Sequence, residues 1–220
     1  MKNILIILAK SPEPHNVKTR MIYKDIISAK DAAMIYQELL FNLANQLIIN
    51  EVEFHLCVNN QCISYFNDSI FNSIHKLSHN FNNIGKIIKH VIKNHFETEN
   101  DKLIISVSDV IYPTVDIICH SFELLEKKDV VLGKSSDGGF YLIGLKKELN
   151  IFSDIEWSTD KVFGQMEKNM NQQNLTFSTL NDIPEIDTVD DLKKIYKIYM
   201  HNKDFQQKYP FTWKKTLEII

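Results

Sequence analysis

The amino-acid sequence predicts an α/β fold, in which helices cover both faces of a mostly parallel β-sheet. Strand-like and helix-like segments alternate almost to the end of the 220-residue chain, a pattern that favours parallel strands joined by helices. Largely apolar runs at 4–9, 102–107 and 140–145 are typical of strands that are covered on both faces. We expect one domain over residues 1–200 and a C-terminal appendage over 201–220 that packs on it.

Each element follows from the local pattern of the chain. The run at 4–9 is the first strand, and the polar segment 10–20 after it is kept extended by Pro12 and Pro14. Apolar residues recur at a helical period over 28–49, and the alternating segment 51–58 predicts the second strand. Thr114 and Ser158 are the expected N-caps of later helices, and Thr188 starts the last predicted helix. The remaining elements are expected, in chain order, as a short helix at 62–71, a strand at 74–78, a helix at 84–96, a strand at 102–107, a helix at 114–127, strands at 130–133 and 140–145, a helix at 158–171, a strand at 175–180 and a helix at 188–200.

Composition excludes several classes of protein. The chain carries 25 Lys and Arg against 28 Asp and Glu. This charge balance does not predict binding to nucleic acid or to a membrane surface, since such binding usually needs an excess of basic residues. The three cysteines Cys57, Cys62 and Cys119 lack C-x-x-C spacing, which indicates thiols in a reducing compartment. The first apolar run is too short for a signal-peptide core or a membrane span. We therefore expect a soluble, cytoplasmic protein.

The loop after the first strand is basic. In parallel α/β sheets, ligands bind outside the carboxyl ends of the strands, and the segment 10–20 lies at such an end. It carries Lys10, Lys18 and Arg20, and several cations in one exposed loop suit a phosphate or diphosphate group. The alternative is a basic loop that only faces solvent.

Two carboxylates are expected at the same edge of the sheet. Asp109 follows the strand 102–107, where it can hold a divalent cation that bridges nucleotide phosphates. Asp187 precedes the helix 188–200 and can supply a second ligand for that cation. The alternatives are that Asp109 caps the helix that begins near Thr114, and that Asp187 belongs to an acidic cluster that only stabilises its helix.

The segment Asp137-Gly138-Gly139 lies between two predicted strands. Adjacent glycines allow positive φ and a close approach of the backbone to a ligand, while Asp137 is placed to bind a sugar hydroxyl or to act as a base. The alternative is a simple hairpin turn, for which Asp-Gly is a strong local signal. Trp157 either stacks on a sugar or base or packs in the core.

Five stretches of the sequence, taken in order, resemble one known family: ILIILAKSPEPHNVKTRM, VSDVIYP, GKSSDGGFYLIGL, IEWSTDKVF and EIDTVDDL. They are similar to stretches of the glycosyltransferase-A-like (GT-A) family of small bacterial nucleotide-diphospho-sugar transferases, of the arsenosugar-biosynthesis type. The resemblance covers about residues 2–200, and the ordered set is more specific for the superfamily than for a substrate. It implies a three-layer α/β/α sandwich with a mixed, mostly parallel, seven-stranded sheet.

The resemblance also implies roles for individual positions on the nucleotide side. Lys18 and Arg20 fall on the Lys-Thr-Arg segment of the family, which implies contacts with the diphosphate. Asp109 falls on the carboxylate that holds metal and nucleotide in the superfamily. Asp187 precedes the Thr-x-x-Asp-Leu helix, at a position where related nucleotidyltransferases hold the same metal.

The match has one further agreement and some departures. The segment 137–139 matches the Asp-Gly-Gly of the family. His15 stands where the family usually has Gly, the Gly-Ser-Asp segment reads Val-Ser-Asp at 107–109, and the proline that usually follows is displaced to Pro113. These departures touch the nucleotide side and leave open an altered donor or a degenerate member.

The residues and the resemblance together predict a glycosyltransferase with a nucleotide-diphospho-sugar donor, a small-molecule acceptor and a divalent cation, Mg²⁺ or Mn²⁺, as cofactor. Asp137 is the predicted catalytic residue, which orients or deprotonates the acceptor hydroxyl. One alternative is a nucleotidyltransferase that joins a nucleoside triphosphate to a small phosphate and releases pyrophosphate. Such enzymes usually wrap the triphosphate in a Gly-rich loop after the first strand, whereas this chain has no Gly before Gly85. The other alternative is a degenerate, non-catalytic domain that binds a nucleotide or a partner protein.

Overall fold

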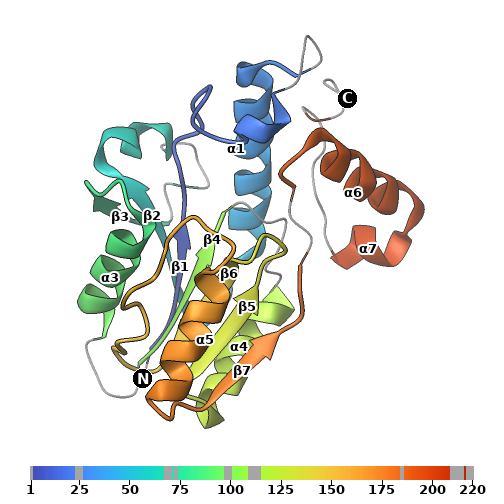
Figure 1. Cartoon of the computed structure of the whole chain (residues 1–220). Helices are drawn as coiled ribbons and strands as arrows, with labels where there is room; N and C mark the ends of the chain where they lie inside the picture. The colour runs from blue at the N-terminus through green and yellow to red at the C-terminus, as the bar shows by residue number, and fades with distance from the viewer. Residues whose placement is uncertain are drawn as a thin grey trace.

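A mixed β-sheet forms the middle layer of the fold (Figure 1). The computed structural model describes residues 2–22, 27–66, 71, 74–96, 101–108, 115–183, 186–208 and 216. The strands in this part of the chain are β1 (Asn3–Leu8), β2 (Val52–Asn59), β3 (His75–His79), β4 (Lys102–Val107), β5 (Val130–Lys134), β6 (Phe140–Leu145) and β7 (Phe177–Leu180). They form one seven-stranded sheet in the order β3-β2-β1-β4-β6-β5-β7. β6 runs antiparallel to β4 and β5, while the other described pairs are parallel.

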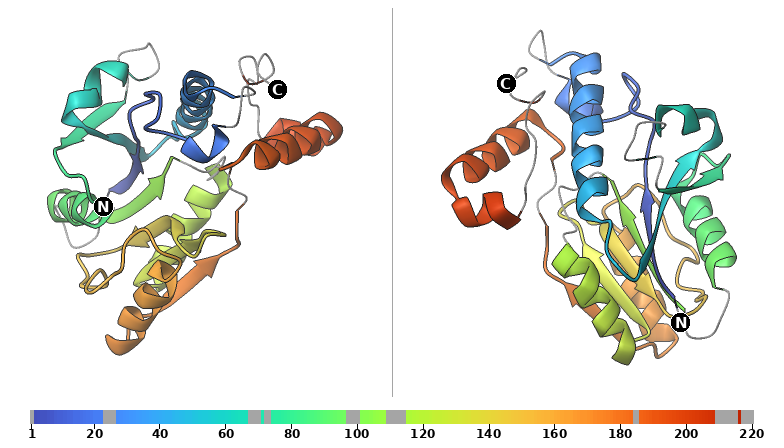
Figure 2. Two further views of the ribbon diagram at one scale, coloured as in Figure 1. Left: turned by 45° about the horizontal axis from the view of Figure 1, so that its top comes forward. Right: turned by 180° about the vertical axis from the view of Figure 1, so that it is seen from behind.

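Helices cover both faces of this sheet (Figures 1 and 2). α1 (Ala29–Gln46) and α4 (Val115–Lys127) pack on one face, where Leu5 and Ile7 of β1 join their core. α3 (Ile84–His95) and α5 (Val162–Gln172) pack on the other face, with Ile4 and Ile6 of β1. Neighbouring residues of a strand point to opposite faces, so an unbroken apolar run fills both cores. The three layers and the mixed, mostly parallel sheet confirm the predicted fold class.

The strand order contains a switch point between β1 and β4. β2 and then β3 lie on one side of β1 in the sheet, and β4 lies on the other side of β1. The carboxyl ends of both strands lie level, since Leu8 is in register with Val107. Ligands of open α/β sheets bind at such a point, because the loops diverge there and leave a crevice.

Two predicted helix starts are confirmed by capping boxes. Ser28 Oγ accepts the backbone N–H of Asp31 at 3.1 Å before α1. Thr188 Oγ1 accepts the backbone N–H of Asp191 at 3.2 Å before α6 (Val189–His201). In both, the Asp side chain accepts the backbone N–H of the cap residue in return. Thr114, expected to cap α4, lies outside the described residues.

The predicted start of α5 at Ser158 is wrong. The helix begins at Val162, and Ser158 has a left-handed φ of 65°. Local hydrogen bonds compete with helix formation here, since Thr159 Oγ1 donates to the carbonyl of Glu156 at 2.7 Å. Of the short helix expected at 62–71, residues 62–66 belong to a 3₁₀ segment, η2 (Asn60–Phe66), residues 67–70 lie outside the described residues, and residue 71 is helical.

The C-terminal part makes contacts with the rest of the chain. α7 (Lys203–Lys208) packs on α6 through Phe205 and Tyr199, whose ring centroids are 6.4 Å apart. Thr216 donates from its backbone N and its hydroxyl to Glu38 of α1, at 3.0 and 2.7 Å. The division into a domain and an appendage at residue 200 stays a prediction. None of the helices in the described part of the chain is long and apolar enough to cross a bilayer.

Candidate active site

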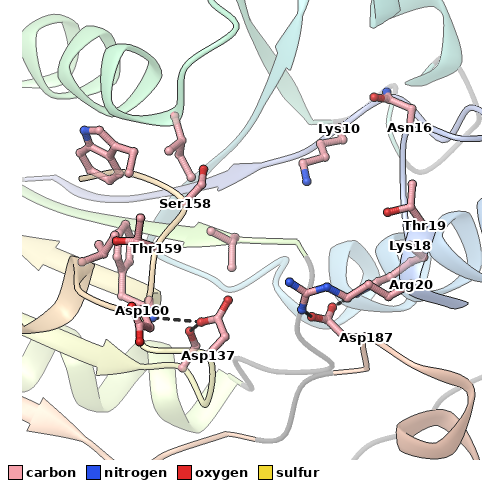
Figure 3. Close-up of a pocket in the computed structure, with 17 residues that line it drawn as sticks. Lys10, Asn16, Lys18, Thr19, Arg20, Asp137, Ser158, Thr159, Asp160 and Asp187 are labelled. Carbon is pink, nitrogen blue, oxygen red and sulfur yellow. Dashed lines mark hydrogen bonds and ion pairs between the residues drawn. The ribbon is translucent and has the colours of Figure 1, made fainter. Parts of the chain in front are cut away.

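A pocket of about 490 Å³ opens at the switch point of the sheet (Figure 3). The segment after β1 and the end of β4 contribute Lys10 and Val107 to its wall. Three carboxylates also line the wall: Asp137 from the β5–β6 turn, Asp160 from the loop before α5, and Asp187, which directly precedes the N-cap of α6. With Ile84 at the start of α3, the structure therefore brings segments from six places in the sequence to one cavity at the strand ends.

Basic side chains form one part of the pocket. Lys10, Lys18 and Arg20 all line it, and they come from the loop that sequence analysis selected for a phosphate group. Lys18 has a left-handed φ of 48° and precedes η1 (Thr19–Met21), which places Arg20 within that short 3₁₀ turn. The side chain of Lys18 is only 1% exposed, whereas the side chain of Arg20 is 69% exposed.

Asp187 contacts two of these cations. Its Oδ2 accepts from Arg20 Nη1 at 2.9 Å, and its Oδ1 lies 3.6 Å from Lys18 Nζ. Figure 3 shows Asp187 beside Arg20, apart from Asp137 and Asp160. The carboxylate thus pairs with both cations and fixes their positions at the pocket wall.

A buried hydrogen-bond network fixes the loop after β1 to the end of β4. The backbone N–H of Lys10 donates to Tyr36 Oη at 2.9 Å, and Tyr36 Oη shares a 2.7 Å hydrogen bond with Ser108 Oγ. Tyr36 is fully buried in α1. The network connects the residues that follow β1 and β4 at the switch point to one helix, α1.

The Asp-Gly-Gly segment is a hairpin turn, and it also lines the pocket. Asp137 Oδ1 accepts from Ser135 Oγ and, at 2.9 Å, from the backbone N–H of Gly139. Gly138 has φ +86°, and a Cβ at this residue would lie 2.2 Å from the carbonyl oxygen of Asp160. Glycine is required here both by conformation and by the close approach of the neighbouring loop. Since Asp137 and Gly139 line the cavity, the turn and the ligand-binding interpretations hold together.

The loop before α5 is part of the wall that sequence analysis missed. Ser158, Thr159 and Asp160 line the pocket, although they were expected in the first turn of a helix. The motif IEWSTDKVF was the available signal for this loop. Trp157 is half-buried at the pocket wall, and it packs against Gly85 so closely that a Cβ there would lie 2.3 Å from the indole nitrogen.

Of the two carboxylates expected to hold a divalent cation, the structure describes one, Asp187, which is paired with Arg20 and Lys18. Asp187 has lone pairs left on both oxygens and can accept a cation, but its partner in the prediction, Asp109, lies outside the described residues. Within the described residues, no group of three or more His, Cys, Asp or Glu side chains is arranged to hold a metal ion. The shared cation site of Asp109 and Asp187 therefore stays a prediction.

One departure from the family pattern has a structural counterpart. His15, which stands where the family usually has Gly, has a left-handed φ of 66°. This conformation is one that Gly adopts without strain and that other residues adopt less readily. The loop therefore keeps the glycine-like backbone while it carries an imidazole.

The fold, a mixed and mostly parallel seven-stranded sheet between two layers of helices, is that of nucleotide-diphospho-sugar transferase-like proteins. The chain belongs to a family described as uncharacterized proteins conserved in bacteria (DUF2064), whose model matches residues 43–159. No curated protein matches the sequence.

Solved structures show the same fold. A candidate nucleotide-diphospho-sugar transferase from Desulfovibrio desulfuricans G20 has a TM-score of 0.84 at 24% identity, over 94% of this chain and 92% of that one. The 4-diphosphocytidyl-2C-methyl-D-erythritol synthase of Anaerococcus prevotii DSM 20548 has a TM-score of 0.58 at 9% identity, over 91% and 99% of the chains. Rv0371c of Mycobacterium tuberculosis H37Rv, in complex with manganese, has a TM-score of 0.51 at 9% identity, over 89% and 99%. At these identities the likeness concerns the fold.

Proposed function

We propose that the protein is a glycosyltransferase that binds a nucleotide-diphospho-sugar with a divalent cation and transfers the sugar to a small acceptor. The observation that carries this proposal is the pocket at the switch point, which Lys10, Lys18 and Arg20 line together with Asp137. Cations of this kind suit a diphosphate, and a carboxylate suits a hydroxyl group. The finer assignment to the arsenosugar-biosynthesis type rests on the sequence motifs alone.

The basic residues take the diphosphate in this proposal. Arg20 can bind phosphate oxygens in a bidentate way, and the buried ammonium of Lys18 is a fixed point charge beside it. Charge develops on the leaving diphosphate during transfer, so both groups stabilise the transition state more than the ground state. A divalent cation on Asp187 and Asp109 would neutralise further charge on the same phosphates.

Asp137 acts on the acceptor. Its Oδ1 is held by the two hydrogen bonds of the turn, which fix the carboxylate at the pocket wall. The second oxygen of the carboxylate can accept the proton of an acceptor hydroxyl. Removal of this proton makes the hydroxyl oxygen of the acceptor a better nucleophile. The proton passes from the acceptor to Asp137, and the bond between the sugar and the diphosphate breaks as the new glycosidic bond forms.

A second function, nucleotidyl transfer, is favoured by a different observation. The loop after β1 has left-handed φ values of 66° at His15 and 48° at Lys18. Gly-rich phosphate loops use such conformations to turn backbone N–H groups toward a ligand. The absence of Gly before Gly85 therefore weighs less against a triphosphate-binding loop than the sequence suggested. This function would join a nucleoside triphosphate to a small phosphate.

One experiment separates these functions. Purified protein with Mn²⁺ or Mg²⁺ is incubated with a panel of nucleotide sugars and, separately, with nucleoside triphosphates and sugar phosphates. Release of a nucleoside diphosphate supports the glycosyltransferase, and release of pyrophosphate supports the alternative. Asp204→Asn, an exposed carboxylate of α7, is the matched control for Asp137→Asn. Binding of nucleotides without turnover of any donor would contradict both and leave a degenerate, non-catalytic member.

A further inference from the structure

The pocket carries its positive and negative charges in separate regions (Figure 3). Of the described residues that line the cavity, the basic ones all come from the loop after β1: Lys10, Lys18 and Arg20. Asp187 pairs with two of these cations, but Figure 3 shows Asp137 and Asp160 apart from Arg20. If the basic region takes the diphosphate, the acidic region formed by Asp137 and Asp160 is the part of the pocket left for the acceptor.

Two segments that bond to each other build this acidic region. The backbone N–H of Phe163, in the first turn of α5, donates to the carbonyl of Gly138 at 3.0 Å. The backbone of Asp160 lies so close to Gly138 that it leaves no room for a Cβ there. These contacts hold the carboxylates of Asp137 and Asp160 on one wall of the cavity, since both residues line it.

The basic residues next to this region make their contacts elsewhere. Lys161 follows Asp160 in the chain, and its Nζ donates to Glu156 Oε2 at 2.9 Å. Lys134 ends β5, and its Nζ lies 5.5 Å from the ring centroid of Phe163. Neither lysine is among the described residues that line the pocket. An anionic acceptor in the acidic region would therefore meet two carboxylates, and the described cations of the pocket wall are those that take the diphosphate.

An indole completes this part of the pocket. Trp157 lines the cavity and stacks on Phe152, with ring centroids 6.2 Å apart and an interplanar angle of 21°. Gly85 leaves the space that the indole occupies. An aromatic ring at a pocket wall gives a rigid apolar surface on which the C–H groups of a sugar or polyol pack. The hydroxyl groups of the same molecule can donate to carboxylates, which only accept hydrogen bonds.

We infer, on the basis of the proposed function, that the acceptor is an uncharged, polyhydroxylated molecule and that Asp160 and Trp157 select it. Asp137 takes the proton of the attacking hydroxyl, Asp160 accepts a hydrogen bond from a further hydroxyl, and Trp157 contacts the apolar face of the acceptor. A phosphorylated acceptor is disfavoured by charge. At an effective dielectric constant of ~40 and a separation of ~6 Å, one carboxylate disfavours a unit negative charge roughly tenfold.

Ligand-observed NMR tests this acceptor class without depending on turnover. The full chain is saturated with ADP, CDP, GDP and UDP in Mg²⁺, so that the basic region is occupied. Saturation-transfer titrations then compare matched pairs, namely glycerol with glycerol phosphate, glucose with glucose phosphate, and inositol with inositol phosphate. We expect at least one neutral compound to bind, and to bind roughly tenfold or more tightly than its phosphate.

Variants test the two selecting residues. Asp160→Asn should reduce the preference for the neutral compound roughly tenfold. Trp157→Leu should weaken binding of the neutral compound by about 2–10-fold and leave the affinity for nucleoside diphosphates unchanged, while Trp157→Phe should restore most of the loss. Asp154→Asn is the matched control, because Asp154 is an exposed carboxylate of the same loop outside the described pocket lining. It should change neither quantity.

Three results would overturn the inference: a phosphate that binds as tightly as its neutral partner, no binding of any neutral compound, or an unchanged preference in Asp160→Asn. Circular dichroism and nucleotide affinity show that each variant is folded. Release of nucleoside diphosphate from nucleotide sugars tests the proposed function separately. A preference for neutral compounds without such release would contradict the transferase and leave the binding preference standing, whereas release with phosphorylated acceptors would contradict only the acceptor class.

Discussion

Replacing Asp187 by Asn tests whether the carboxylate of Asp187 and a diphosphate ligand compete for Lys18 and Arg20. The carboxylate holds Arg20 at 2.9 Å and Lys18 at 3.6 Å. Solvent screens the pair with Arg20, whose side chain is 69% exposed, so that pair contributes about 0–1 kcal/mol. The interaction with buried Lys18 contributes about 1 kcal/mol more. Without a divalent cation, a diphosphate that binds the two cations competes with this carboxylate for their N–H donors.

Two opposite effects are expected, depending on metal. Without divalent cations, Asp187→Asn should strengthen diphosphate binding by up to roughly tenfold, since about 1.4 kcal/mol corresponds to a factor of ten. With Mn²⁺ the same change should weaken binding, because a metal ligand has lost its charge. Isothermal titration with ADP, CDP, GDP and UDP, in EDTA and in Mn²⁺, measures both effects.

The control for this experiment is the neighbouring carboxylate. Asp190→Asn removes an exposed negative charge from the first turn of α6 and should change neither measurement. Weaker binding of Asp187→Asn in EDTA would refute the competition between carboxylate and diphosphate. An unchanged dependence on Mn²⁺ would refute the role of Asp187 as a metal ligand.

Three further changes probe the turn at the pocket and the edge of the sheet. Asp137→Asn should keep the turn and nucleotide binding but lower turnover about 10²-fold or more in steady-state assays, and full turnover would leave Asp137 as a turn residue only. Gly138→Ala should lower the free energy of unfolding by about 1–3 kcal/mol, because its Cβ would meet the backbone of Asp160; a wild-type melting temperature would contradict this. Hydrogen bonds from Thr176 hold the pKa of Asp129 below its ordinary value of 3.8, so this contact stabilises the fold above that pH and is lost as pH falls through the lower folded pKa. Asp129→Asn should therefore lower the free energy of unfolding, measured in urea, by about 1 kcal/mol at pH 7 and by less at pH 3. Equal effects at both pH values would show that the charge of Asp129 does not contribute to stability.

Local patterns in the sequence determined most of the secondary structure. The apolar runs at β1 and β4, the caps at Ser28 and Thr188 and the Asp-Gly-Gly turn are each specified by residues within one or two turns of chain. Such signals need no distant partner, because burial periodicity and capping hydrogen bonds are short-range. The strand-end rule then selected the loop after β1, the turn at Asp137 and the segment at Asp187, but it did not select the loop before α5, which also lines the pocket.

Only the tertiary structure decided which side chains meet. Arg20 and Asp187 are separated by 167 positions in the sequence, and their ion pair depends on the docking of α6 beside the loop after β1. The loop at Ser158 is not helical, because Thr159 hydrogen-bonds to the carbonyl of Glu156 and Trp157 packs against Gly85. The periodicity of apolar residues does not reveal these contacts. Histidines of β2, β3 and α3 also become neighbours only through strand register and helix packing. Contacts of this kind depend on the packing of whole elements, a long-range property that no local segment encodes.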